Sequence, residues 1–191
     1  MFKAHKVPKL ELLRIPPNEV AARIPSRLVV GMSSCQLSRT QIWLEHLLTP
    51  LSITYGAFEH IKDSSDFLKH LENVKETGQN QGWDWDNMVL FSVDIKALYP
   101  SIKFEFLVLA LNRCFDKHTD WSNNVKSHLV ELIVYTLENQ QIYWEHNFYT
   151  LRQGIPTGGK HSVPLANILL TFIMIYTFET NNDLNKNSRI L

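Results

Sequence analysis

Apolar residues recur every three or four positions in several segments of the chain, which predicts amphipathic helices with one buried face. The first predicted helix covers Ser38–Leu48, and Pro50 is expected to stop it because proline lacks an amide donor. A second is expected to begin at a cap on Ser64 or Ser65 and to reach about Thr77, with Gly78 as its stop.

Three more helices are expected in the second half of the chain. Two helical patterns cover about 103–117 and 123–139, and a strongly apolar stretch, Leu165–Phe178, follows Pro164. Pro164 or Leu165 is expected to open this last helix. The stretch is shorter than the about 20 apolar residues that a membrane span needs, and polar residues interrupt it. A buried core helix is therefore expected, and no membrane partner.

Short strands are expected between the helices. Arg27–Val30 and the strongly apolar segment Met88–Ile95 each predict one strand. Gln141–Leu151 predicts a β-hairpin, because aromatic residues suited to strands flank His146-Asn147. Many helices with few strands predict an α+β fold that is rich in helix and contains a small antiparallel sheet.

The polar segment Gly78–Asn87 marks the expected boundary between two regions, residues 1–87 and residues 88–191. Residues 1–30 contain four prolines and are expected to be mostly extended. No internal repeat is visible.

Composition sets broad limits on the class of protein. The chain has 191 residues, 45% of them hydrophobic, which suffices for one domain with a real core. Lys plus Arg and Asp plus Glu both total 19, and this zero net charge is mild evidence against a free-standing nucleic-acid binder. Cys35 and Cys114 fit neither a metal site nor a disulfide framework, so an intracellular protein without a signal peptide is expected.

Asp94 is the first residue with chemical promise. It ends the predicted strand Met88–Ile95, where an acid is costly unless a group such as a divalent cation compensates its charge. Tyr99 follows five positions later, where its ring could stack beside a sugar. A surface aspartate followed by a core tyrosine explains the pair equally well.

A glycine-containing loop covers Gln153–Ser162, directly before the last predicted helix. Its three glycines would let the backbone approach a ligand, the helix start offers free N–H groups, and Lys160 adds positive charge. The spacing fits neither a P-loop nor a dinucleotide-binding motif. Phosphate binding and an ordinary flexible loop with a helix cap both remain open.

Basic residues are frequent near the N-terminus, and they could contact phosphates or form a solvated charged face. They are Lys3, His5, Lys6, Lys9, Arg14, Arg23 and Arg27.

Taken in order, these features resemble the reverse transcriptase family, most closely the enzymes of Penelope-like retroelements. FKAHK at residues 2–6, RLVV at 27–30 and SRTQIWLEHLLTPL at 38–51 are similar to the fingers region, although Phe2 and Leu28 replace prolines of the family pattern. VDIKALYPSI at 93–102 resembles motif A.

The segment at 138–168 resembles the hairpin and motif B. Its matching residues are Gly154, Pro156, Gly158, Gly159, Ser162, Leu165, Ala166 and Asn167. Thr157 stands where many relatives have Gln, and Val163 stands where they have Pro. The resemblance extends from Phe2 to about Phe178.

The resemblance implies a partial right-hand polymerase fold, with fingers at 1–87 and an incomplete palm at 88–191. It implies DNA synthesis on an RNA template, with a DNA primer, dNTPs and two Mg²⁺ ions about 3.5–4 Å apart. Asp94 would be the catalytic, metal-binding carboxylate, assisted by the carbonyl of Ile95, and Tyr99 would exclude the ribose 2′-OH. The remaining residues are implied to contact the nucleotide (Lys3, Lys6, Arg27, Gln153, Gly154) or the template (Pro156, Thr157, Gly158, Gly159).

Motif C, an aromatic-x-Asp-Asp hairpin, is not found after Phe178, where the sequence is ETNNDLNKNSRIL. A single carboxylate cannot hold two metal ions, so this chain alone, which also lacks a thumb, is expected not to polymerise DNA. It would be a fragment of a longer enzyme or a decayed copy.

Two other interpretations stay open. One is a repurposed, non-catalytic module that binds RNA or protein. The other, less favoured, is a piece of a family-B DNA polymerase, whose motif A also contains LYPSI. Retroelement behaviour implies a nuclear location, and the oligomeric state stays open.

Overall fold

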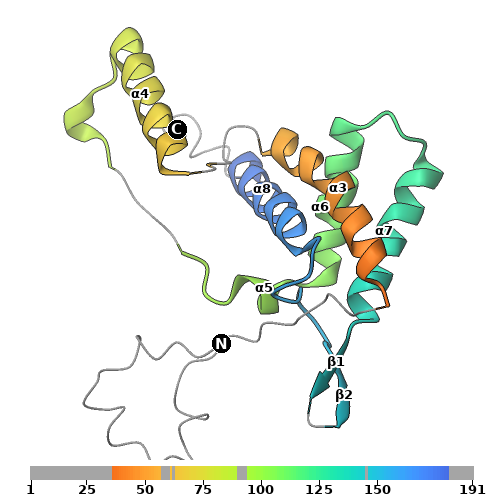
Figure 1. Ribbon diagram of the computed structural model, residues 1–191. Helices are drawn as coiled ribbons and strands as arrows, with labels where there is room; N and C mark the ends of the chain where they lie inside the picture. The colour runs from red at the N-terminus through yellow and green to blue at the C-terminus, as the bar shows by residue number, and fades with distance from the viewer. Residues whose placement is uncertain (1–35, 57–60, 62, 90–93, 145, 181–191) are drawn as a thin grey trace, which may run out of the picture.

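The computed structural model describes residues 36–56, 61, 63–89, 94–144 and 146–180 (Figure 1). The predicted strand Arg27–Val30, the basic residues Lys3, Lys6 and Arg27, and the centre of the predicted strand Met88–Ile95 lie outside these residues. The elements in chain order are α3 (Ser38–Tyr55), α4 (Ser64–Gln81), the 3-10 helix η2 (Trp85–Asn87), α5 (Leu98–Ser101), α6 (Phe104–His118), α7 (Asn123–Glu138), β1 (Gln141–Trp144), β2 (Asn147–Thr150) and α8 (Ser162–Thr180).

Four of these helices, α3, α6, α7 and α8, pack together into a bundle (Figure 1). Each contributes apolar side chains at helical spacing to one shared core, whose burial is the main stabilising contribution to the fold. The largest fully buried apolar side chains are Leu44, Leu48, Leu107, Leu111, Phe115, Ile133, Leu137, Leu165 and Ile168.

Specific contacts fix the helices against one another at the edges of this core. The ring of Tyr55 at the end of α3 lies edge-on to His118 at the end of α6, with centroids 5.4 Å apart. Arg113 Nη2 on α6 donates to both carboxylate oxygens of Glu179 on α8, at 2.5 and 2.6 Å. The C-terminal half of α6 is thereby tied to two helices that are distant in sequence.

The predicted hairpin is confirmed, and it projects from one end of the bundle (Figure 1). β1 and β2 are antiparallel, with Gln141 opposite Thr150 and Trp144 opposite Asn147. Asn147, expected in the turn, is the first residue of β2. His146, the second residue of the two-residue link, has a φ of 65°, as the second residue of a type I′ hairpin turn does. A helix-rich α+β class with a small antiparallel sheet is therefore correct.

α3 continues through Pro50 to Tyr55, so the predicted stop at Pro50 is wrong. Pro50 lies on the exposed side of the helix, while Leu48, Ser52 and Tyr55 continue the buried face beyond it. The free energy gained by burying this face thus exceeds the cost of the hydrogen bond that Pro50 cannot donate. The helix ends at Gly56, whose N–H donates to Ser52 O at 3.1 Å.

α4 also differs from its predicted bounds. Its N-cap is Asp63, whose Oδ1 accepts from the Asp66 N–H at 2.9 Å, and Ser64 is already helical. Gly78 does not stop the helix, which continues to Gln81 and ends at Gly82 in the left-handed conformation, with φ 63°. Part of the predicted loop Gly78–Asn87 is therefore helix.

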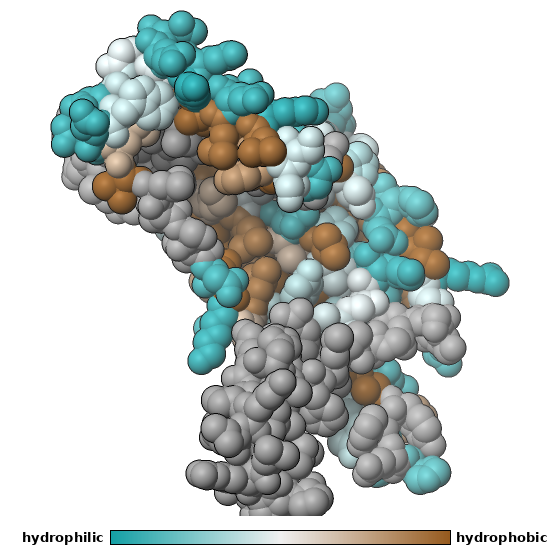
Figure 2. All heavy atoms as spheres, turned by 60° about the vertical axis from the view of Figure 1, so that its left-hand side comes forward, coloured by the Kyte–Doolittle hydropathy of each residue, from teal (hydrophilic) through white to brown (hydrophobic). Residues whose placement is uncertain are grey.

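α4 stands apart from the four-helix bundle in Figure 1 and is amphipathic rather than buried. Its apolar residues Phe67, Leu68 and Leu71 are exposed. Figure 2 shows apolar side chains among hydrophilic ones on the face that this view brings forward.

The predicted helices at about 103–117 and 123–139 are confirmed as α6 and α7. The last helix, α8, begins at Ser162 rather than at Pro164 or Leu165, because a proline in the first turn replaces an N–H that has no helical partner. Within the described residues, no helix is long and apolar enough to cross a membrane.

Candidate functional site

The glycine loop before α8 lies against the segment that contains α5. Gly154 N–H donates to Ile102 O at 3.1 Å, and Ile155 N–H donates to Tyr99 O at 2.9 Å. The side-chain amide of Gln153 adds a third hydrogen bond, from Nε2 to Pro100 O at 3.3 Å. Two segments about 50 positions apart in sequence are thereby joined through their backbones.

Glycine is required at position 154 by both conformation and space. Gly154 is buried and has a φ of 86°, which other L-residues rarely adopt. A Cβ at this position would lie 2.7 Å from Tyr99 O and 2.8 Å from Pro100 Cα. At Gly154 the close approach is to the chain's own backbone at Tyr99 and Pro100. The predicted approach of the loop to a ligand stays a prediction.

The loop then turns tightly into α8. The buried Pro156 accepts at its carbonyl from Gly159 N–H at 3.2 Å and from Ser162 Oγ at 2.8 Å. Gly158 is exposed with a φ of 113°, while Gly159 is buried against Ser162 Oγ. Thr157 is half-buried. Of the four predicted template-binding residues, Pro156 and Gly159 are therefore buried within the turn, whereas Thr157 and Gly158 have accessible surface.

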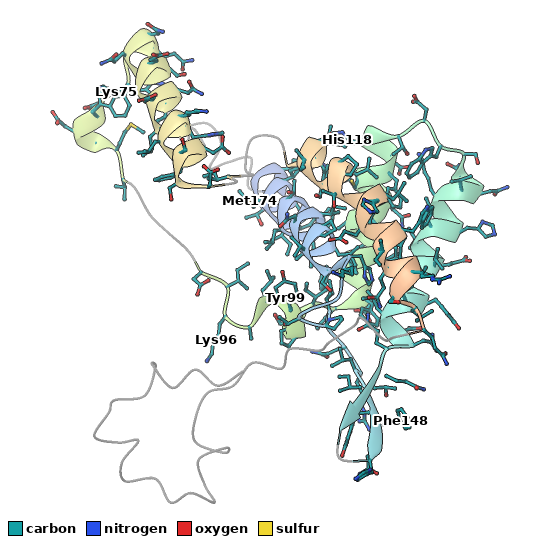
Figure 3. The ribbon with its side chains drawn as sticks, viewed as in Figure 1. Lys75, Lys96, Tyr99, His118, Phe148 and Met174 are labelled. Carbon is teal, nitrogen blue, oxygen red and sulfur yellow. The ribbon has the colours of Figure 1, made fainter. Side chains whose placement is uncertain are left out.

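Asp94, Ile95 and Tyr99 lie on the approach to α5. Asp94 and Ile95 are exposed, and Tyr99 is half-buried and packs against the core. In Figure 3, Tyr99 lies beside the junction with the glycine loop, while Lys96 points away from the helices. The structure thus places Tyr99 with Gln153 and Gly154, and it leaves the Asp94 carboxylate accessible to solvent.

Ala97 has a backbone conformation that the sequence did not predict. Its φ of 54° and ψ of 46° are left-handed, which costs a non-glycine residue about 1–2 kcal/mol. Its carbonyl accepts from both the N–H of Ser101, at 3.2 Å, and the hydroxyl of Ser101, at 2.8 Å. This left-handed residue changes the direction of the chain between Asp94 and Tyr99. The sequence could not predict it, because alanine is not a residue type that favours this conformation.

His161, which the sequence analysis did not single out, lies fully buried at the start of α8. Its Nε2 is 3.2 Å from Thr136 Oγ1 on α7, and burial lowers the pKa of His161 to about 4. Its neutral ring therefore connects α7 to the end of the glycine loop. The sequence alone does not indicate whether a histidine in a glycine-containing loop is buried, as His161 is, or exposed.

The resemblance implies a pair of Mg²⁺ ions, which would need several carboxylate ligands close together. Across the part of the chain that the structure describes, no three His, Cys, Asp or Glu side chains are grouped so that they could hold a metal ion. Asp94 is the one carboxylate that these residues bring to the approach to α5. They do not by themselves fit two ions, and the magnesium site stays a prediction.

The other predicted nucleotide contacts, Lys3, Lys6 and Arg27, lie outside the described residues. Comparisons with protein-family models, with curated proteins and with solved structures find no match to this chain.

Proposed function

We propose that the chain is part of a reverse transcriptase domain of a retroelement, comprising fingers and an incomplete palm. One observation supports this most directly: hydrogen bonds join residues 99–102 to residues 153–155. These two segments are the ones that resemble motif A and motif B. In a polymerase that uses both motifs, they must lie side by side to enclose one nucleotide.

In this proposal the junction is the floor of a nucleotide site. Two contacts fix Tyr99: its side chain packs against the core, and its backbone carbonyl accepts from Ile155 N–H. A ring fixed in this way can limit the space beside a sugar. Gln153, whose amide donates to Pro100 O, and the exposed Gly158 would face the template base and the incoming nucleotide. Asp94, three residues before the left-handed Ala97, is exposed, so its carboxylate could meet a cation.

The proposed substrates are dNTPs, and the proposed partners are an RNA template and a DNA primer. Magnesium would supply charge neutralisation at the phosphates when bound. Asp94 would be one of its ligands, and the others would have to come from residues outside those described. The chain as given is accordingly proposed to bind an RNA–DNA hybrid without extending the primer.

The test is primer extension by the full translation product of the transcript that encodes this chain, on an RNA template with Mg²⁺ and dNTPs. Asp94→Asn should lower the extension rate by roughly 10²–10³-fold, because it removes a charge that acts on the reacting phosphates. Asp120→Asn is the matched control, since Asp120 is an exposed aspartate in the turn between α6 and α7. It should leave the rate unchanged.

Tyr99→Ala gives a second readout on the same product. It should raise the incorporation of ribonucleotides relative to deoxyribonucleotides, because the space beside the sugar becomes larger. A product that binds RNA but extends no primer, with or without Asp94, would refute the polymerase proposal. That result would favour the non-catalytic binding module.

A further inference from the structure

Two tryptophans pack on the C-terminal end of α4, away from the proposed nucleotide site. The rings of Trp83 and Trp85 lie over the buried Gly78, where an added Cβ would meet Trp85 Cη2 at 2.7 Å and Trp83 Cε3 at 2.9 Å. Their centroids are 6.0 Å apart, at an interplanar angle of 50°. Trp85 is nevertheless 45% exposed, so much of its indole faces solvent.

Acidic residues precede and follow the exposed ring of this ring pair, Trp83 and Trp85, in the sequence. Asp84 and Asp86 flank Trp85 and are exposed. Asp84 is already engaged, because its carboxylate accepts from Asp86 N–H at 3.2 Å and from Asn87 Nδ2 at 2.7 Å. The carboxylate of Asp86 has no hydrogen bond or ion pair among the described residues and is available to a ligand.

The surroundings add to this negative potential. The C-terminal end of a helix carries partial negative charge, and α4 ends at Gln81, directly before the ring pair. From residue 76 to residue 95 the sequence has Glu76, Asp84, Asp86 and Asp94 but no Lys, Arg or His. The nearest preceding cation is Lys75, which lies on α4 one turn before Gly78 (Figure 3).

We infer that the ring pair and Asp86 form a binding site for an arginine side chain of a basic peptide. The face of an indole attracts a cation within about 6 Å of its centroid, and tryptophan is the best aromatic residue for this contact. A planar guanidinium can stack on the exposed face of Trp85 while its N–H groups reach a carboxylate. Phosphate groups are repelled by the same charges, so the surface does not suit nucleic acid, and the inference is independent of the proposed polymerase function.

Gly78 explains why this site is rigid. Glycine inside a helix lowers its stability relative to alanine, yet at this position it leaves room for both indole rings. The rings are thereby held in one arrangement before any ligand binds, which lowers the entropic cost of binding.

The experiment is a titration of the ¹⁵N-labelled full chain with a capped tetra-arginine peptide, followed through the indole N–H signals at low ionic strength. The signals of Trp83 and Trp85 should shift saturably. A capped tetra-glutamine peptide should not move them. Trp43, which is 50% exposed on α3, is the internal control and should stay in place.

Two variants test the assigned roles. Asp86→Asn should weaken binding by about two- to fivefold, as expected for an exposed ion pair. Gly78→Ala should abolish the shifts by displacing both rings, while far-UV circular dichroism shows that α4 keeps its helicity.

Equal shifts of Trp43 and Trp85, or unchanged affinity in both variants, would overturn the inference. A single-stranded oligonucleotide that moves the Trp83 and Trp85 signals more than the arginine peptide would also overturn it, in favour of base stacking.

Discussion

Lowering the pH from 7 to 5 should destabilise the fold through His161. Thr136 Oγ1 donates its own hydrogen to Ile133 O at 2.7 Å, so the hydrogen on the neutral imidazole must be on Nε2, pointing at Thr136. The added proton would therefore go to Nδ1, which is buried without a hydrogen-bond partner among the described residues. This burial is why the pKa of His161 is lowered from 6.5 to about 4.

The size of the stability loss follows from the difference between the pKa of His161 in the folded chain and its pKa in the unfolded chain. One pH unit corresponds to about 1.4 kcal/mol, so the lowered pKa of His161 is worth about 3 kcal/mol in total. The unfolded chain takes up the proton near pH 6.5, whereas the folded chain takes it up near pH 4. Stability is thus fully present above about pH 6.5 and falls as the pH decreases toward 4, with about 2 kcal/mol lost between pH 7 and pH 5.

Urea unfolding at pH 7, 6 and 5 measures this loss directly. His161→Gln keeps a side-chain N–H that can donate to Thr136 Oγ1 but has no group that titrates in this range. It should be less stable than the wild type at pH 7, and its stability should change by about 2 kcal/mol less between pH 7 and pH 5. His128→Gln is the control, because it makes the same substitution at an exposed histidine on α7 rather than at the buried one.

Parallel pH profiles for the wild type and His161→Gln would refute the reasoning. They would mean that the imidazole is accessible to water in solution, or that Nδ1 finds an acceptor when it is protonated.

Two further substitutions follow from the packing. Gly154→Ala should destabilise the fold by about 1–3 kcal/mol more than Gly82→Ala. Both glycines have left-handed φ values, but only a Cβ at position 154 would meet the backbone of Tyr99. Equal urea midpoints for the two variants would show that the loop can move away. Gln41→Leu should stabilise the fold by about 1 kcal/mol in the same assay, because this buried amide has no hydrogen-bond partner among the described residues; a loss of stability would reveal a partner in solution.

Helices with a continuous apolar face were predictable, because burial and periodicity indicate the same structure. The bounds of α6 and α7 fall within one residue of their predicted positions. The hairpin was predictable because aromatic residues, which favour strands, lie on both sides of its turn. Pro50 and Gly78 misled because contacts that periodicity does not reveal outweigh their tendency to end a helix. These are the burial of Tyr55 beyond Pro50 and the packing of two indole rings on Gly78.

The candidate site was predictable only as two separate segments. The glycine at position 154 could be recognised as a place where the chain needs unusual freedom. The backbone bonds from residues 153–155 to residues 99–102 could not, since a backbone hydrogen bond leaves no pattern in side-chain types. The same holds for the left-handed Ala97, and for His161, whose burial depends on α7.

The place of α3 in the bundle affects how the protein is made. α3 ends at Tyr55, but it packs against α8, which begins at Ser162. At about 5–20 residues per second, a ribosome takes roughly 5–20 s to synthesise the chain between these two points. During that time the buried face of α3, including Leu44 and Leu48, lacks α8 as a partner. The nascent chain therefore exposes this apolar surface until α8 has been synthesised, and a chaperone that binds during this interval would protect it from aggregation.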